Sequence, residues 1–321
     1  MSALSILGSK LGDATTANYY YQFRTNYVNL YDAVNQQFRT KSSAGVWGAL
    51  SAGFFEGNGM DYRFAAPQDP YGLLGLYGPS NAVSLIDTYL RGHADYNDYQ
   101  LIYMWLPIFA DRADETETLV RIIYVPRFNG LTMAEGFSPG GWGDYYTDNA
   151  GPLACCLLGL YYIPASGAEW MISSPSFNRV VIHGKTDITI QTVGGVTNNN
   201  YINSIQLNGA AYPSFVISGQ TLVAGNQTFT LSLTNSPARI GSLYLSSADG
   251  DVLSASTDNS TYLGFNIDPM AATCGAQIYS IVQPSSITLN GTNFSNWSYN
   301  PSSKLVTLIG MTKGLYRVSV P

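Results

Sequence analysis

Apolar residues in the first half of the chain recur at every third or fourth position, which is the period of an α-helix. In residues 15–32, Tyr20, Phe23, Tyr27 and Leu30 keep this spacing. Similar patterns predict further helices, the second of them kinked at a proline, over residues 79–92, 98–113, 114–125 and 150–163. Long glycine-rich loops, such as residues 125–150, separate the helices and are expected to carry function.

The pattern changes near Glu169, where apolar and polar residues begin to alternate in short runs. Alternation of this kind is typical of half-buried β-strands. Turn residues separate the runs, and Asn208-Gly209 is a strong signal for a β-hairpin. A second set of alternating runs follows residue 240 and predicts a small β-sandwich.

These patterns predict an α+β multidomain protein in which a helical region is followed by antiparallel β-sandwich domains. We expect residues 1–165 to form the helical region and to carry the active-site loops. Residues 166–240 are expected to form a β-rich region, and residues 241–321 an additional small β-sandwich.

Composition and charge narrow the classes of partner. Charged residues make up 11% of the chain, against roughly 25% in an average soluble domain. The net charge is −6 and no basic run is present, so nucleic acid is not expected as a partner. No apolar run approaches the length of about 18 residues that a membrane-spanning helix needs, so no membrane span is expected.

Asn-x-Ser/Thr sequons suggest an extracellular or cell-surface protein. They all lie in the second half, at Asn226, Asn259, Asn290, Asn293 and Asn296. The N-terminus has no basic region of the kind that begins a signal peptide, so we expect the targeting segment to be absent from this chain. Cys155, Cys156 and Cys274 lack the spacing of a metal site, and one disulfide bond among them is left open.

Three polar clusters in the first half could carry chemistry. The first contains Glu56, Asn58 and Asp69, and the others are "DYNDYQ" at residues 95–100 and "GWGDYYTDNAG" at residues 141–151. Carboxylates from separate loops are what glycoside hydrolysis needs, because one acid protonates the leaving oxygen and a second carboxylate activates water. Nearby aromatic side chains could stack on sugar rings, among them Tyr62, Trp142 and Tyr146.

A structural role is the alternative for each of these residues. An aspartate in a loop is often a turn or helix-capping residue. Asp148-Asn149 precedes a predicted helix, Asn97-Asp98 precedes another, and Asp69 stands beside a proline. The residues alone therefore leave both interpretations open.

Several stretches resemble glycoside hydrolase family 92. "EGNGMDYRFAAPQDPYGL" is similar to that family's E-G-N-x-W-Q-Y-x-W-x-V-P-H-D-x-x-G-L signature. "SGAEWMISSPSFNRVVIH" resembles S-G-x-Y-x-I-G-S-P-x-F-x-x-V, and "YINSIQLNGAAY" resembles a further family segment. Together with residues 24–47, the matches keep the family's order and extend to about residue 240.

The resemblance implies a Ca²⁺-dependent, exo-acting α-mannosidase that inverts configuration, built on an (α/α)₆ barrel of which this chain would supply a C-terminal part. Glu56 would be the general acid. Asn97 and Asp98 would bind Ca²⁺. Asn58, Tyr62, Asp69, Trp142 and Tyr146 would contact the mannose-containing glycan. A second chain or a missing N-terminal region would complete the barrel.

The sequence also departs from the family pattern at the position of the general base. Asn149 stands where the family has an aspartate, and an amide cannot accept a proton from water in that role. Asp148, one residue away, is a candidate substitute. Two hypotheses follow, an α-mannosidase-like hydrolase and a catalytically inactive descendant that binds glycans or serves as a structural surface protein.

Overall fold

The computed structural model describes residues 2–54, 58–92, 103–125, 143–163, 169–212, 214–237, 243–257, 261–269 and 272–321, with the backbone alone over residues 143–150. The chain divides into two compact units. Unit 1 comprises Met1–Ala82, Pro164–Gly167 and Gly241–Pro321, and unit 2 comprises Val83–Ile163 and Ala168–Ile240. The chain passes between the units after Ala82, Ile163, Gly167 and Ile240, and the three-part division expected from the sequence stays a prediction.

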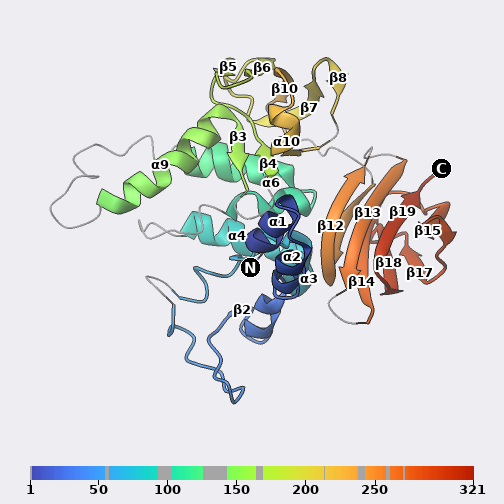
Figure 1. The fold of residues 1–321 in the computed structure, drawn as a ribbon. Coiled ribbons are helices and arrows are strands. Elements are labelled where there is room, and N and C mark those ends of the chain that lie inside the picture. The colour runs from blue at the N-terminus through green and yellow to red at the C-terminus, as the bar shows by residue number, and fades with distance from the viewer. Residues whose placement is uncertain are drawn as a thin grey trace. The chain divides into compact units, whose positions relative to one another are not determined.

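Unit 1 begins with short helices packed as a hairpin, α1 (Ser2–Lys10) and α2 (Ala14–Tyr21), drawn in dark blue in Figure 1. Gly8 allows the close approach, since a Cβ there would lie 2.7 Å from the Ala17 nitrogen. The following elements are η1 (Asn26–Leu30, a 3-10 helix), β1 (Tyr31–Asp32), β2 (Gln37–Phe38) and α3 (Pro70–Tyr77).

The single helix predicted over residues 15–32 is wrong. The α-helix ends at Tyr21, and the later aromatic residues of the stretch pack individually. Tyr27 and Tyr31 both make edge-to-face contacts with Phe38, at centroid separations of 5.9 and 6.0 Å. A continuous helix would place these rings along one stripe, whereas here they converge on one residue of the next hairpin.

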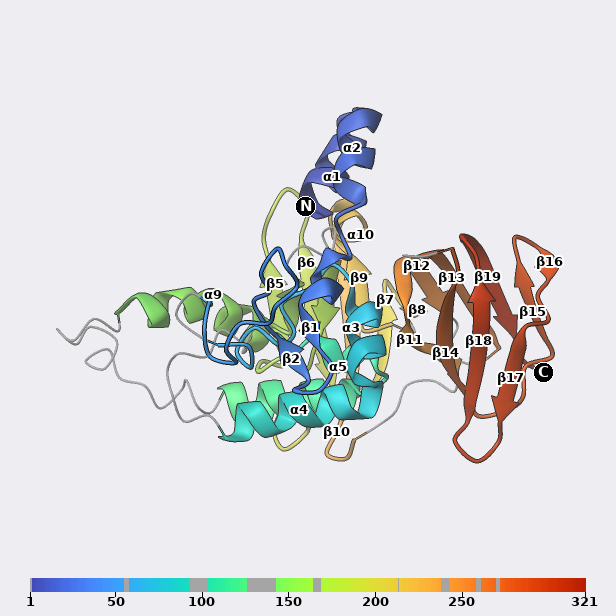
Figure 2. The ribbon, with the colours of Figure 1, turned by 90° about the horizontal axis from the view of Figure 1, so that it is seen from below.

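The C-terminal part of unit 1 is a β-sandwich, drawn in orange and red in Figure 1. One sheet has the order β11-β14-β18-β17 and the other β12-β13-β19-β15-β16, and Figure 2 labels their strands in a second view. Inward-facing apolar residues of both sheets, among them Phe265, Ile278 and Tyr316, form one buried core. The strands are β11 (Leu243–Ala248), β12 (Gly250–Thr257), β13 (Tyr262–Pro269), β14 (Cys274–Ser280), β15 (Ser286–Leu289), β16 (Thr292–Asn293), β17 (Trp297–Asn300), β18 (Leu305–Met311) and β19 (Gly314–Ser319).

Within unit 1 the N-terminal helices contact the sandwich directly. Tyr71 of α3 packs on the sandwich core, and a Cβ at Gly75 would lie 2.8 Å from the Ala248 carbonyl oxygen. The Tyr21 hydroxyl donates to Asp268 of β13 at 2.7 Å, and Lys313 pairs with the same carboxylate at 2.6 Å. Residues more than 200 positions apart in the chain are thereby joined into one unit.

Unit 2 contains two sheets, one ordered β5-β6-β10-β7-β8 and the other β3-β4-β9. The pairs are antiparallel apart from β6 and β10, which run parallel. Asn208 and Gly209 both have positive φ, at 53° and 83°, and join β7 to β8 as the predicted hairpin. The strands are β3 (Leu160–Tyr162), β4 (Glu169–Ile172), β5 (Arg179–Ile182), β6 (Ile188–Val193), β7 (Tyr201–Leu207), β8 (Ala210–Ala211), β9 (Val216–Ser218) and β10 (Gln227–Thr234).

The helices of unit 2 differ in part from the prediction. Instead of a kinked helix over residues 98–113, the described part contains buried turns and the single-turn α5 beginning beside Pro107. The helix predicted over residues 150–163 ends at Leu158, because Gly159 adopts a φ of 83° and the chain continues as β3. The helical elements are α4 (Pro79–Gly92, which begins in unit 1), α5 (Leu106–Phe109), α6 (Ala113–Thr118), η3 (Leu119–Tyr124), α9 (Gly143–Leu158) and α10 (Gly219–Val223).

Candidate functional site

The loop that carries Glu56 is held at both of its ends, although residues 55–57 themselves lie outside the described residues. Phe54, which precedes these residues in the sequence, stacks on Tyr62, with centroids 5.4 Å apart and planes 18° apart. Tyr62 is half-buried, so its ring both supports the loop and reaches the surface. The ring stack therefore brings together the chain on either side of the proposed acid.

Asn58 and Asp61 close the turn that follows residues 55–57. The Asn58 backbone N–H donates to Asp61 Oδ2 at 2.7 Å, and Asn58 Oδ1 accepts from the Met60 N–H at 2.7 Å. Gly59 must be glycine, since a Cβ there would overlap the Phe38 carbonyl oxygen. Asn58 is half-buried, and its sugar-binding role stays a prediction.

Asp69 is buried, with 2% exposure, and caps α3. Its carboxylate accepts from the Gly72 N–H at 3.0 Å and from the Tyr27 hydroxyl at 2.7 Å. Burial raises the pKa of Asp69, while the bonds from Tyr27 and Gly72 and the charge of Arg24 act to lower it. The structure thus shows Asp69 in a structural role, which was the alternative to a functional role in the sequence analysis. Glycan binding by Asp69 stays a prediction.

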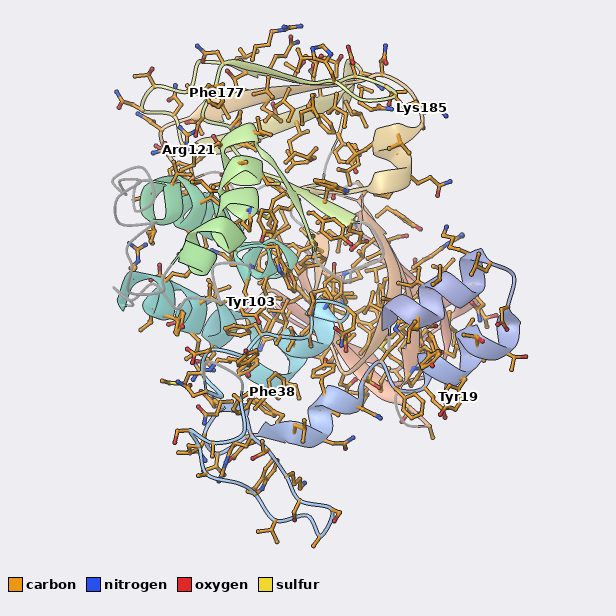
Figure 3. All side chains as sticks on the ribbon, turned by 60° about the vertical axis from the view of Figure 1, so that its left-hand side comes forward. Tyr19, Phe38, Tyr103, Arg121, Phe177 and Lys185 are labelled. Carbon is orange, nitrogen blue, oxygen red and sulfur yellow. The ribbon has the colours of Figure 1, made fainter. Side chains whose placement is uncertain are left out.

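An aromatic framework beneath this loop escaped the sequence analysis. Tyr77 of α3 donates its hydroxyl to the Arg63 carbonyl oxygen at 2.8 Å and packs edge-to-face on Tyr31 at 5.1 Å. Burial raises the pKa of Tyr77, which keeps the phenol protonated as a donor. Figure 3 labels Phe38, the residue on which Tyr27 and Tyr31 converge. The signal in the sequence was the density of tyrosines, which indicates buried hydroxyls that need partners.

The predicted metal ligands Asn97 and Asp98, and the predicted sugar contact Trp142, lie outside the described residues. Among the residues that the structure does describe, no group of three or more His, Cys, Asp and Glu side chains is placed to hold a metal ion. Binding of Ca²⁺ by Asn97 and Asp98 stays a prediction.

Asp148, Asn149 and Tyr146 lie within α9, of which the structure describes only the backbone at these positions. The sequence placed Asp148 and Asn149 in a loop before a helix, whereas the helix begins at Gly143. Pro152, inside the helix, has no N–H to donate to the Asp148 carbonyl four residues earlier. The helix is thus locally weakened at the proposed base, and the catalytic roles of Asp148 and Asn149 stay predictions.

Three acids of unit 2 that the sequence analysis did not single out are buried, in the case of Glu117, or half-buried, in the cases of Glu115 and Glu169. Both carboxyl oxygens of Glu117 accept from the Ile202 N–H, at 3.0 and 3.1 Å, and burial raises its pKa well above the usual range. Burial and a hydrogen bond with Asp87 raise the pKa of Glu115 to about 7. Burial raises the pKa of Glu169 to about 7 as well.

Arg121, one turn after Glu117, braces the segment that leads into β5. It donates to the Pro175 carbonyl oxygen and, at 3.1 Å, to Ser176 Oγ. Figure 3 labels Arg121 on its helix and Phe177 on the segment that Arg121 holds. We assign Arg121 a structural role, because its donors are used by main-chain and hydroxyl oxygens.

The sequons differ in how their side chains are used. Asn226 and Asn290 accept backbone N–H groups, from Asp187 and Leu315, and Asn296 donates its amide to the Ile309 carbonyl at 2.8 Å. Asn293 lies exposed on the edge strand β16, and Asn259 lies outside the described residues. Glycosylation of these asparagines stays a prediction. The three cysteines are free thiols in the structure.

Comparison with known families decides the ancestry of the chain. The family model described as the glycosyl hydrolase family 92 catalytic domain matches residues 2–234. The chain belongs to glycosyl hydrolase family 92. The match includes the Glu56 loop, both other polar clusters and all of unit 2 up to β10, which confirms the resemblance seen in the sequence. A search of the curated proteins finds no match.

Solved structures of family 92 members share the fold. The inverting mannosidase BT2199 of Bacteroides thetaiotaomicron VPI-5482 is 20% identical with a TM-score of 0.62, covering 73% of this chain and 36% of that one. The α-mannosidase BT3965 of Bacteroides thetaiotaomicron is 17% identical with a TM-score of 0.63, at 74% and 34% coverage. The family 92 hydrolase ccman5 is 16% identical with a TM-score of 0.60, at 74% and 38% coverage.

The family 92 chain described here thus spans about a third of the length of these solved structures. It has the mixed helices and multiple sheets of its relatives, and at these identities the likeness concerns the fold alone. Within the described residues, no helix combines the length and the apolar character needed to cross a membrane.

Proposed function

We propose that the chain acts on glycans as part of an inverting hydrolase of terminal α-mannosides. The observation that carries this proposal is the family 92 match over residues 2–234, which includes every proposed catalytic position. Glu56 would protonate the leaving oxygen, and a carboxylate on the opposite side of the sugar ring would accept a proton from the attacking water. The solved α-mannosidases of the same family support mannose as the sugar.

Asp148 is the proposed base, because Asn149 occupies the position of the family's aspartate. In an inverting enzyme the two carboxyl groups are roughly 6.5–9.5 Å apart, which leaves room for the water. Asn97 and Asp98 would hold Ca²⁺, whose oxygen ligands are usually of this kind. Asn58, Tyr62, Asp69, Trp142 and Tyr146 would contact the glycan, and the half-buried ring of Tyr62 suits this role.

The second candidate function is glycan binding without hydrolysis, and Asn149 is the observation that favours it. Loss of a general base commonly costs about 10²–10⁴-fold in rate. A chain that kept the fold and the acid loop but lost its base would bind glycans or act as a structural surface protein. This function needs the same carbohydrate surface but no second carboxylate.

A complete (α/α)₆ barrel is proposed to require more protein than this chain. The solved relatives are about three times as long as the region that matches them. A second chain or a preceding region would supply the remaining helices. An extracellular or cell-surface location is proposed from the sequons and from the glycan substrate.

The test is hydrolysis of an aryl α-mannoside and of α-mannobiose by the full chain, with added CaCl₂ and with a chelator. We expect Glu56→Gln to lower kcat at least 10²-fold, as loss of a general acid does, and NMR to show the inverted anomer as first product. Glu117→Gln is the matched control, because it makes the same change from acid to amide at a buried carboxyl that accepts from a backbone N–H.

Asn149→Asp separates the two candidate functions. If the chain has lost its base, the rate of α-mannoside hydrolysis should be negligible in the wild type and higher in Asn149→Asp, while glycan binding is unchanged. If Asp148 already acts as the base, Asp148→Asn should abolish turnover and Asn149→Asp should change little. Turnover that survives Glu56→Gln would remove Glu56 from the mechanism.

A further inference from the structure

The outer face of one sandwich sheet lies beyond the region matched by family 92, which ends at residue 234. Leu263 and Phe265 of β13 and Tyr316 of β19 point into the core. Because side chains alternate along a strand, the residues between them face outward. These outward positions are almost all polar or small, namely Tyr262, Gly264, Asn266, Ser286, Thr288, Leu315, Arg317 and Ser319.

Tyr262 lies along this face instead of standing up from it. A Cβ placed on Gly264, two residues further along β13, would overlap Tyr262 Oη and lie 3.0 Å from the ring carbon Cζ. Gly264 is buried although it faces outward, and Tyr262 itself is partly exposed. The glycine thus provides the space in which the tyrosine ring rests on the sheet, with its other side turned away from the backbone.

Hydrogen-bonding groups surround the ring. Gly264 pairs with Arg317 of β19, and Arg317 pairs with Thr288 of β15. Tyr262 pairs with Ser319 in the neighbouring row. Residues directly opposite on adjacent strands have Cβ atoms about 4.5–5.5 Å apart. Arg317 and Ser319 therefore lie on the strand beside the ring, on the same face, and Thr288 lies on that face one strand further away.

The opposite end of this face is already occupied within unit 1. Asp268 is six residues along β13 from Tyr262, which is about 20 Å at the rise of a strand. There its carboxylate binds the Tyr21 hydroxyl of α2 and the Lys313 ammonium. Lys313 is therefore neutralised by a close ion pair, and among the described residues of β13, β19 and β15 Arg317 is the basic side chain on the rows beside the ring. One guanidinium beside hydroxyls suits a neutral polar ligand better than a polyanion.

We propose that Tyr262, resting on Gly264 with Arg317 and Ser319 on the adjacent strand and Thr288 on the next, is a surface binding site for a neutral glycan. One face of a pyranose ring presents C–H groups that pack on an aromatic ring, while its hydroxyls both donate and accept hydrogen bonds. A platform of one aromatic ring with polar neighbours matches both properties. The site would hold the chain on a polysaccharide while Glu56 acts elsewhere, and mannan as the preferred polymer rests on the proposed function.

Affinity electrophoresis of the full chain in gels containing soluble α-mannan, β-glucan or galactomannan tests this site. We expect retardation by at least one polymer, and Tyr262→Ala to weaken the apparent affinity roughly ten-fold, as truncation of an aromatic anchor does. Tyr262→Phe should retain it, because the ring remains. Tyr279→Ala is the matched control, since Tyr279 is a partly exposed ring on the outer face of the other sheet, stacked on Tyr244.

Gly264→Ala is the sharper variant, because it leaves every side chain of the site present. Its Cβ takes the space of Tyr262 Oη, the far end of the side chain, so the ring must move away from its place on the strand. We expect a loss of retardation comparable to that of Tyr262→Ala, with an unchanged melting temperature. No retardation of the wild type by any polymer, or equal retardation of the wild type and Gly264→Ala, would overturn the site.

The test also separates this site from the proposed active site. Tyr262→Ala should leave hydrolysis of a small aryl α-mannoside unchanged, and Glu56→Gln should leave retardation unchanged. If the chain proves catalytically inactive, retardation that depends on Tyr262 still establishes the glycan site.

Discussion

Glu117 shows how a single buried carboxyl can serve as an acceptor. It is 1% exposed, and both of its oxygens accept from one backbone N–H, that of Ile202. Its charge is disfavoured by burial, which raises its pKa well above the usual range. Burial therefore favours the uncharged form of the carboxyl that joins α6 to β7, and an amide can imitate that form.

We predict that Glu117→Gln keeps or raises the stability of unit 2 at pH 7, because the amide oxygen still accepts from Ile202 and carries no charge. Glu117→Leu should lower the free energy of unfolding by about 1–3 kcal/mol, since the Ile202 N–H would be buried without a partner. Urea unfolding of both variants measures the difference. Equal losses for the two substitutions would show that the ionised carboxylate itself is needed.

At the scale of elements, helix α3 depends on an N-terminal cap shared with another segment. Asp69 accepts from the Gly72 N–H within the helix and from the Tyr27 hydroxyl just after η1 starts. Gly72 must be glycine here, because a Cβ would overlap the Asp69 carboxylate. The cap therefore joins the start of α3 to the segment that carries Tyr27. Because Asp69 ends the stretch that follows Glu56, the same contact also holds the end of that stretch.

We predict that Asp69→Ala lowers the stability of unit 1 by about 1–2 kcal/mol, the usual loss when a capping side chain is removed. Asp69→Asn should be tolerated, because asparagine caps as well as aspartate and adds no buried charge. Chemical unfolding measured by tyrosine fluorescence reports the change.

Asp13 offers a matched control at this scale, because it caps α2 with an exposed side chain. Asp13→Ala should cost less than Asp69→Ala. A loss for Asp69→Asn as large as that for Asp69→Ala would show that the charge of Asp69, near Arg24, matters more than its acceptor oxygens.

The two units of the molecule are expected to respond to pH in different ways. In unit 2, the pKa values of Glu115 and Glu169 are both raised to about 7. A raised pKa means that the folded state prefers the protonated acid, so this stabilisation is lost as pH rises. In unit 1, hydrogen bonds from Arg39 and Asn35 lower the pKa of Asp32 to about 2, and its contribution is lost only in strong acid.

We predict that amide protection of β4 and β9 falls as pH rises from about 4.5 through about 7, once intrinsic exchange rates are corrected. In Glu169→Gln, the change in the free energy of opening of these strands over this pH range should be smaller by on the order of 2 kcal/mol, because glutamine has no group that ionises. Hydrogen exchange with mass spectrometry measures both. The strands β13 and β18 of unit 1 serve as an internal control in the same sample, and an unchanged pH profile in Glu169→Gln would contradict the prediction.

Much of the β-structure follows from local pattern. Alternating residues on β7, β10 and β14 predicted strands that the structure contains, because a strand with one buried face needs the same period wherever it packs. The turn at Asn208-Gly209 could likewise be predicted from two adjacent residues, since both tolerate positive φ. The family signature also located the Glu56 loop, because it depends on consecutive residues.

The extents of the helices and the hydrogen-bond partners of the acids could not be predicted from the sequence, because they depend on contacts made only in the folded chain. Tyr27 lies at helical spacing from Tyr20 and Phe23, yet its hydroxyl serves Asp69, 42 residues away. Asp69 is distinguished from an ordinary turn residue by this contact, and Tyr262 from an ordinary strand tyrosine by the glycine on which it rests. Periodicity reports which face of a segment is apolar, whereas hydrogen-bond partners and ring orientations depend on distant residues that folding brings together.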